Sequence, residues 1–186
     1  VSAGSTGAQL VASTLFLRLL PGVKRPGIAV SLPTQTGRCL LVDAGANIYC
    51  KPEHLYQYGL MASVFCEQVL GIARPKVGLL NVCSEEEKGT DLVAQTAALL
   101  KDAPIQYGGF AEGTDIFQGR FDIVVCDGFV GNTILKVSEG LAESILSELK
   151  KNLGESPVAM LGAMMAKGAF RKLKKKIDYA EYGGEP

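Results

Sequence analysis

The sequence contains no tryptophan, only one histidine, and no excess of charge of either sign. Its 19 Lys and Arg side chains balance 19 Asp and Glu side chains, so the formal net charge at pH 7 is zero. A neutral chain has no overall field that would attract nucleic acid, and we expect no nucleic-acid partner. The single histidine, His54, is accompanied by no GxSxG motif, which disfavours a serine triad and indicates a structural role.

The five cysteines are spread too widely to form a metal site or a CxxC pair. They stand at positions 39, 50, 66, 83 and 126, and a zinc site is not expected without close-spaced ligands. This usage is typical of small buried side chains in a reducing compartment. The chain also has no apolar stretch long enough for a signal peptide or a membrane-spanning helix. We therefore predict a cytoplasmic protein with no metal and no cofactor.

The sequence does contain the pattern of a single α/β domain. It is 47% hydrophobic and 20% charged, which is typical of a chain with a packed core. Short β-branched runs predict strands, and amphipathic stretches predict helices between them. This alternation indicates a largely parallel sheet. The expected strands are 28–32, 39–42, 77–82, 105–107 and 121–126, and the expected helices are 6–20, 52–70, 88–101 and 132–153.

Both ends of the sequence resemble interruptions of a longer chain. Val1-Ser2 reads as the last step of a strand, with no initiator Met, and the chain stops abruptly after Gly183-Gly184. We therefore expect residues 1–186 to form a single α/β domain that is a fragment, lacking N-terminal and C-terminal segments.

Polar residues and glycines follow the predicted strands one after another. Asp43 and Asn47 follow the second strand, Asn81 lies at the end of the third, and Asp127 and Gly131 follow the fifth. The predicted strand at 105–107 leads into Gly108-Gly109. Open α/β sheets bind ligands in a crevice outside the carboxyl ends of their strands. The pattern therefore predicts a binding crevice at this edge, with the joint at 127–132 as one wall.

A small-residue loop at 2–7 precedes the first predicted helix. Small residues let backbone N–H groups approach an anion, and a helix N-terminus favours negative charge. The alternative is an ordinary loop that ends in a helix cap. The candidate anion-binding residues are Ser2, Gly4, Thr6 and Gly7.

Two polar side chains are candidates for direct contact with substrate. Lys88 stands at the start of a predicted helix, after three Glu residues, and either binds an anion or belongs to a solvated charge cluster. Asn132 either caps the helix that follows or donates its amide to a developing oxyanion.

The segment 157–178 differs in character from the rest of the chain. Within it, residues 157–176 combine Met, Leu and Phe with six of the 19 basic residues in ten positions. Apolar and basic residues at helical spacing suit an anionic membrane surface. The alternatives are a helix at a dimer contact, or a docking site for an acidic protein.

Eight segments, in one order and at matching spacing, resemble the PlsX family of bacterial phosphate acyltransferases. The resemblance covers almost the whole chain, and the combination is specific although no single segment is. Ser5 departs from the family pattern, where Asn is usual, and Glu185 stands where Ala is usual. The segments are SAGSTGA (2–8), PGVKRPGIA (21–29), LLVDAGAN (40–47), KPEHL (51–55), VGLLNV (77–82), EEEKG (85–89), CDGFVGNTILK (126–136) and YAEYGG (179–184).

This resemblance implies a fold, a reaction and partners. The fold is a three-layer α/β/α arrangement like that of isocitrate and isopropylmalate dehydrogenases. The reaction converts acyl-[acyl carrier protein] and inorganic phosphate to acyl phosphate for phospholipid synthesis. The implied assembly is a homodimer, with peripheral contact to the membrane.

The residue types fit such a reaction, because phosphate itself is the nucleophile and a thiolate leaves readily. We expect Lys88 to balance the phosphate charge and Asn132 to hold the acyl or phosphoryl oxygen. The loop at 2–7 would supply N–H donors, and Asp43, Asn47, Asn81 and Asp127 would shape the crevice. Two alternatives remain open: a phosphotransacetylase-like enzyme that uses coenzyme A esters, and a non-catalytic module that binds membrane or carrier protein.

Overall fold

The structure is a computed structural model that describes residues 6–83, 85 and 88–177. A five-stranded sheet with the order β1-β2-β5-β3-β4 forms its centre. The pairs β2–β5, β5–β3 and β3–β4 are parallel, while β1 runs antiparallel to β2. This confirms the prediction of a mostly parallel α/β sheet. The strands are β1 (Ala29–Pro33), β2 (Arg38–Val42), β3 (Lys76–Leu80), β4 (Gln106–Ala111) and β5 (Ile123–Val125).

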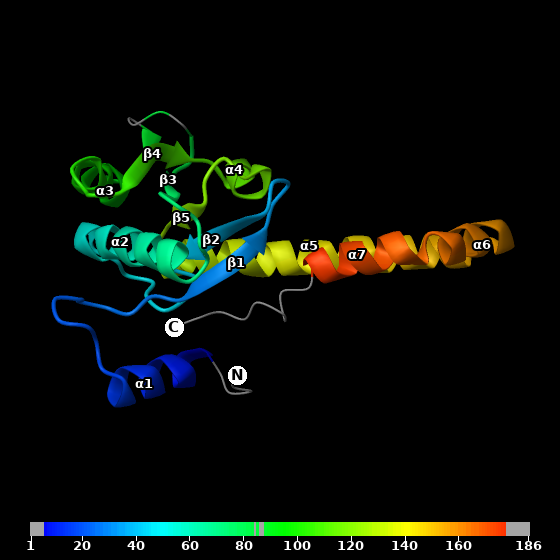
Figure 1. Cartoon of the computed structure of the whole chain (residues 1–186), viewed down its shortest axis with the longest axis horizontal. Helices are drawn as coiled ribbons and strands as arrows, with labels where there is room; N and C mark the ends of the chain where they lie inside the picture. Colours follow the sequence, from blue (N-terminus) through cyan, green and yellow to red (C-terminus); the bar gives the residue numbers. More distant parts are fainter. Residues whose placement is uncertain (1–5, 84, 86–87, 178–186) are drawn as a thin grey trace.

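Helices follow most strands, as Figure 1 shows. The four expected helices are all present, although their ends differ from the prediction by several residues. One short helix, α4, was not predicted, because six residues are too few to display a helical period. The helices are α1 (Thr6–Phe16), α2 (Pro52–Gln68), α3 (Asp91–Lys101), α4 (Gly113–Gln118), α5 (Gly128–Gly154), α6 (Pro157–Met165) and α7 (Lys167–Ile177).

Side-chain alternation along the strands builds a core on each face of the sheet. Leu40 and Val42 of β2 pack with Tyr58 of α2 in one buried cluster. Leu41 packs with Ile116 of α4 in the other cluster, against which Val130, Ile134 and Leu135 of α5 are also packed. Successive strand residues point to opposite faces, so α2 and α3 cover one face and α4 and α5 the other. The described chain therefore has three layers.

The prediction that Gly108 and Gly109 form a loop after the fourth strand is wrong. Strand β4 runs on to Ala111, and both glycines lie within it. A Cβ on Gly108 would lie 2.9 Å from Cε1 of Phe121 and against the side chain of Lys76. Glycine at position 108 leaves space against the strand for those two side chains. The Gly-Gly pair, which usually indicates a turn, is therefore part of a strand here.

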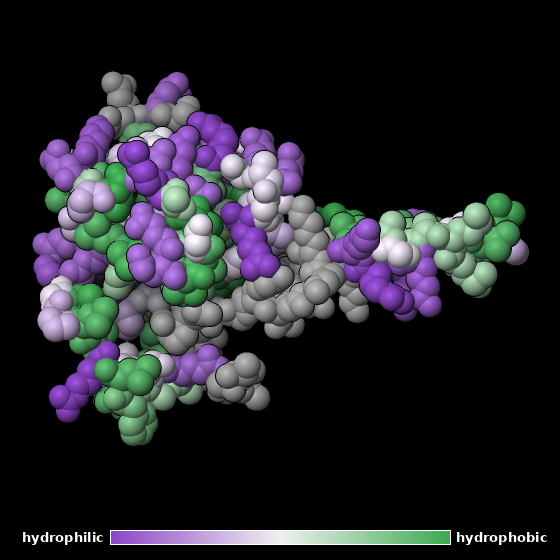
Figure 2. Space-filling model, viewed as in Figure 1, coloured by the Kyte–Doolittle hydropathy of each residue, from purple (hydrophilic) through white to green (hydrophobic). Residues whose placement is uncertain are grey.

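Helices α5, α6 and α7 form an arm that projects from the domain (Figure 1). The chain runs outward along α5 and turns at Glu155 and Ser156, and α6 contacts α5. The predicted helix at 157–178 is thus two helices, which are separated at Ala166. Figure 2 shows hydrophobic residues gathered over α6 at the far end and hydrophilic residues along α7. Within the described residues, no helix has both the length and the hydrophobicity to cross a membrane.

Candidate functional site

The strand register brings several predicted site residues to one edge of the sheet. Val42 pairs with Val125, and Val125 pairs with Leu79, so these three residues are level. Asp43, Asp127 and Asn81 follow within two residues on three adjacent strands. Because adjacent strands lie about 4.8 Å apart, the carboxyl ends of β2, β5 and β3 form one continuous rim.

Asp43 is the centre of the first cluster on this rim, and its side chain is buried. Its Oδ1 accepts hydrogen bonds from the backbone N–H groups of Ile28, Gly45 and Ala46, at 3.1, 3.1 and 2.9 Å. Its Oδ2 accepts from the N–H of Asn47 at 2.7 Å. One carboxylate therefore holds the whole turn 43–47 and joins it to the start of β1.

Asn47 extends this network toward α2 and the segment before β1. Its amide nitrogen donates to the carbonyl oxygen of Pro26 at 2.6 Å and to the hydroxyl oxygen of Tyr58 at 2.8 Å. Its amide oxygen accepts from Nη1 of Arg25 at 3.3 Å. Asn47 is thus a buried connector, so its side chain shapes the rim from within and does not line an open crevice.

Helix α5 begins at the same rim, and Asp127 is its cap. The carboxylate accepts hydrogen bonds from the backbone N–H groups of Phe129 and Val130, at 2.9 and 3.0 Å. The alternative in which Asn132 caps this helix is therefore wrong. The helix starts four residues earlier than predicted, because Asp127 satisfies the first free N–H groups and the glycines at 128 and 131 are helical.

Those two glycines allow α5 to approach the turn 43–47 closely. The N–H of Gly128 donates to the carbonyl oxygen of Asn47 at 2.8 Å, and a Cβ on Gly128 would lie 2.9 Å from the backbone nitrogen of Asn47. A Cβ on Gly131 would collide with the carbonyl oxygen of Asp43. The close approach explains both glycines without a ligand.

Asn132 lies above this contact and faces the turn. A Cβ on Gly45 would lie 3.4 Å from Cβ of Asn132 and 3.6 Å from its amide oxygen. Asn132 is exposed, and its side-chain amide has no hydrogen-bond partner among the described residues. An exposed amide on a rigid helix start can donate to an anion or a polarised carbonyl without first breaking an internal bond.

Lys88 and Asn81 form a second cluster, on the loop after β3. The amide of Asn81 donates to the carbonyl oxygens of Cys83 and Glu85, at 3.0 and 3.1 Å, and so shapes this loop. Nζ of Lys88 lies 2.9 Å from the carboxylate of Glu85, and both side chains are about two-thirds exposed, at 64% and 65%. Helix α3 is capped by Thr90, so Lys88 precedes the helix and does not begin it as predicted.

This arrangement leaves Lys88 available to an anion. Exposed ion pairs contribute only about 0–1 kcal/mol, so the pair with Glu85 is easily exchanged for another anion.

The predicted anion-binding loop falls almost wholly outside the described residues. Ser2 and Gly4 belong to the undescribed part, and Thr6 is the first residue of α1. A Cβ on Gly7 would meet no other atom within 4 Å. Gly7, at the described end of this loop, therefore makes no close contact with the Asp43 cluster.

His54 and the cysteines have structural surroundings. His54 is buried, its Nδ1 accepts from the backbone N–H of Lys51 at 3.1 Å, and burial followed by the charge of Arg25 lowers its pKa. These surroundings agree with the structural role predicted for it. Burial raises the pKa of Cys50 to about 11, helped by Asp43, and raises that of Cys126 well above its usual value. Both thiols stay protonated at neutral pH and are poor nucleophiles.

Two residues of this network were not predicted as functional. Tyr58 and Arg25 both contact Asn47. Tyr58 lies on the apolar face of α2, where an aromatic residue is normally interpreted as part of the core. No pattern in the sequence indicates that its hydroxyl group has a partner. Among the described residues, no three His, Cys, Asp or Glu side chains are placed to hold a metal ion.

The fold is that of an α/β protein with a mostly parallel sheet, and it is similar to the fold of phosphotransacetylases. The structure is similar to EutD phosphotransacetylase from Staphylococcus aureus, with a TM-score of 0.60 and 16% identity, over 76% of this chain and 49% of that one. A phosphotransacetylase from Streptococcus pyogenes is similar over the same shares, with a TM-score of 0.59 and 15% identity. At this level of identity the likeness concerns the fold alone.

The chain belongs to the fatty acid synthesis protein family, whose model matches residues 1–186. It is 47% identical to the phosphate acyltransferase of Geotalea uraniireducens over all 186 residues, which cover 54% of that protein. Identity to the phosphate acyltransferase of Heliobacterium modesticaldum is 50%, over 56% of its length. The chain thus spans about half the length of these relatives.

Proposed function

We propose that the protein is a phosphate acyltransferase that converts acyl-[acyl carrier protein] and inorganic phosphate to acyl phosphate. The observation that carries the proposal is the match of the whole chain to relatives with that name, at 45–50% identity. The rim supports it, because an exposed amide at Asn132 and an exposed ammonium at Lys88 follow two adjacent strands. The proposed location is the cytoplasm, where acyl carrier protein is the acyl donor.

The proposed reaction is a displacement at the thioester carbon. A phosphate oxygen attacks the carbonyl, the carbon–sulfur bond breaks, and the leaving thiolate takes up a proton. Asn132 donates its amide to the carbonyl oxygen as negative charge develops there, and Lys88 balances the charge of the phosphate. Asp43, Asn47 and Asp127 hold the rim in place, and backbone N–H groups of residues 2–7 complete the phosphate site.

An assay with two acyl donors tests this function directly. The intact natural protein is incubated with phosphate and with either acyl-[acyl carrier protein] or the matching coenzyme A ester, and acyl phosphate is trapped with hydroxylamine. We expect turnover with the carrier-protein donor. Turnover with the coenzyme A ester alone would favour a phosphotransacetylase-like enzyme, and no turnover with either would refute the proposal.

Replacing Lys88 by alanine is expected to lower acyl-phosphate formation about tenfold to a hundredfold. The reason is that a hydrogen bond to a charged group is worth about 1.5–3 kcal/mol, and about 1.4 kcal/mol is a factor of ten. The effect should appear as a raised KM for phosphate. Lys150→Ala, at an exposed position on α5, is the control. Activity of Lys88→Ala within threefold of wild type would exclude this role.

We further propose that the whole protein is a homodimer with the chain arrangement of isopropylmalate dehydrogenase, and that the arm contacts an anionic membrane. Met160, Leu161 and Met164 of α6 are exposed, and the basic residues follow in the next helix, α7. Sedimentation velocity of the intact protein measures its assembly.

Co-sedimentation with vesicles tests the membrane contact. We expect the intact protein to pellet with anionic vesicles at low salt and to stay in solution with neutral vesicles, because basic residues near an anionic surface each gain about 1 kcal/mol. Absence of any pelleting with anionic vesicles would contradict the proposal. Binding of acyl carrier protein to the same arm in the absence of vesicles would instead favour docking of the donor protein there.

A further inference from the structure

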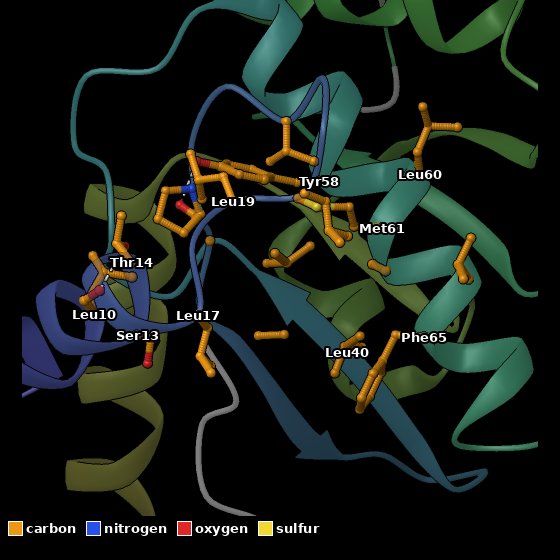
Figure 3. Close-up of a pocket in the computed structure, with 18 of the residues that line it drawn as sticks. Leu10, Ser13, Thr14, Leu17, Leu19, Leu40, Tyr58, Leu60, Met61 and Phe65 are labelled. Carbon is orange, nitrogen blue, oxygen red and sulfur yellow. Dashed lines mark hydrogen bonds between the residues drawn. The ribbon is translucent and has the colours of Figure 1, made fainter.

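A large apolar cavity lies on the α2 face of the sheet, beside its β1 edge. Its volume is about 670 Å³, within the range of about 300–1,000 Å³ that is usual for small-molecule sites. Helix α1 and the segment that follows it form one wall, α2 forms the other, and strands β1 and β2 form the floor. Figure 3 shows Leu17 on one side of the cavity and Met61 on the other.

The lining of this cavity is almost entirely hydrocarbon. Leucine, valine, methionine and phenylalanine side chains make up most of it, and the hydroxyl of Thr14 is already engaged with the carbonyl oxygen of Leu10 at 2.8 Å. Several lining side chains remain open to water, including Leu17, which is 80% exposed, and Val64, which is 60% exposed. An apolar occupant would remove this surface from water, which is favourable in proportion to its area.

One end of the cavity is lined by residues that contact the rim. Tyr58 and Pro26 line the cavity, and both contact the amide of Asn47, at 2.8 Å from the hydroxyl oxygen and 2.6 Å from the carbonyl oxygen. Val42, also in the lining, directly precedes Asp43. This end of the cavity is therefore separated from the turn 43–47 only by the side chain of Tyr58, the carbonyl group of Pro26 and the end of β2.

From there it runs along α2 toward the opposite edge of the sheet. Gln68, at the end of α2, lines the far end, ten residues beyond Tyr58 and so about 15 Å away at 1.5 Å per residue. An extended peptide advances about 3.3–3.6 Å over three bonds, so an extended hydrocarbon chain advances about 1.2 Å per bond by the same geometry. The cavity thus has the length of roughly twelve carbon–carbon bonds.

We infer that this cavity holds the acyl chain of the substrate, with the reactive carbonyl at the turn 43–47 and the methyl end toward Phe65 and Gln68. The inference rests on the proposed function and adds to it the place of the acyl chain and the residues that set its length. Each methylene placed in the cavity contributes about a fourfold gain in affinity, up to about twelve carbons. Longer chains gain little more, because their ends leave the cavity.

The test narrows the cavity with Val64→Trp. Val64 is largely exposed, so the larger side chain fits without disturbing the core. Leu99→Trp, at a partly exposed position on α3 outside the cavity, is the matched control. The intact natural protein and both variants are titrated calorimetrically with saturated fatty acids of six, eight, ten and twelve carbons. We expect the wild-type affinity to rise with chain length, and Val64→Trp to lose at least tenfold for twelve carbons.

Turnover with acyl-[acyl carrier protein] donors of the same lengths gives the second measurement. Val64→Trp should raise KM at least tenfold for the twelve-carbon donor and leave the six-carbon donor within twofold of wild type. An unchanged length profile in both assays would overturn the inference, even if wild-type turnover is normal. Wild-type protein that binds fatty acids as expected but forms no acyl phosphate would refute the proposed function and leave the apolar chain site supported.

A second variant tests the inference by enlarging the cavity instead of narrowing it. Phe65→Ala enlarges the far end of the cavity, where Figure 3 places Phe65 beside Leu40. We expect the preferred chain length to increase by at least two carbons. A preference that shifts equally in Leu99→Trp would show that the change does not come from the cavity, and would also overturn the inference.

Discussion

Replacing Asp43 by alanine is expected to lower the free energy of unfolding by about 4 kcal/mol or more. The buried carboxylate accepts hydrogen bonds from the backbone N–H groups of Ile28, Gly45, Ala46 and Asn47. The N–H groups of Ile28 and Asn47 are buried, and each costs about 1–3 kcal/mol when it loses its partner. The partly buried N–H groups of Gly45 and Ala46 add to this cost, and alanine accepts none of these bonds. Urea unfolding, followed by circular dichroism, measures the change.

Asp127→Ala is the matched control, because it also removes a carboxylate that accepts backbone N–H groups. Asp127 accepts only two such bonds, at a helix start that water can reach, and the loss of a helix cap costs about 0.5–2 kcal/mol. Equal destabilisation by the two substitutions would contradict the central role given to Asp43.

The close contact between the turn 43–47 and α5 can be tested by substitutions in α5. Gly131→Ala should destabilise by about 1–3 kcal/mol, because its Cβ would collide with the carbonyl oxygen of Asp43. Gly140→Ala lies on the same helix with no other atom within 4 Å of the added carbon. It should stabilise by about 0.5–1 kcal/mol.

Replacing Asn132 by alanine is expected to reduce turnover by about 10²–10³-fold, because that is the usual cost of losing one oxyanion donor. The fold should be unaffected, since Asn132 is exposed on a helix and alanine favours helices. The loss should therefore appear in kcat for acyl-phosphate formation by the intact protein, with the melting temperature unchanged.

Asn152→Ala on the same helix is the control for this effect. Asn152 lies near the far end of α5, where its amide contacts Glu148, well away from the rim. Its replacement should leave kcat within twofold of wild type. Full activity of Asn132→Ala would remove Asn132 from the proposed mechanism.

Most of the fold could be predicted from the sequence, because its signals are local. The β-branched runs at 39–42 and 121–126 and the helical period at 52–70 predicted β2, β5 and α2 within a few residues. The interior position of Gly108 could not be predicted, since it depends on Phe121 and Lys76, which are distant in sequence. The order of the strands depends on such distant contacts too, and a local pattern does not contain them.

In the candidate site, too, some features could be predicted from local sequence and others could not. Position after a strand was enough to bring Asp43, Asn47 and Asp127 to one rim. Their hydrogen-bond partners could not be predicted: Asp43 and Asn47 turn inward to backbone groups, and Asp127 caps a helix. Residue type alone cannot distinguish an acid that faces a ligand from one that satisfies buried N–H groups, because both uses favour the same short polar side chains.

Helix α5 begins at the rim with Asp127 as its cap and continues without interruption for 27 residues. At 1.5 Å per residue, it extends about 40 Å. A flexible linker of that many residues would let the spacing of its ends vary widely, whereas a continuous helix keeps it constant. The turn at Glu155 and Ser156 is therefore held at a fixed distance from Asn132. A surface bound at that turn would be kept at the same distance from the rim.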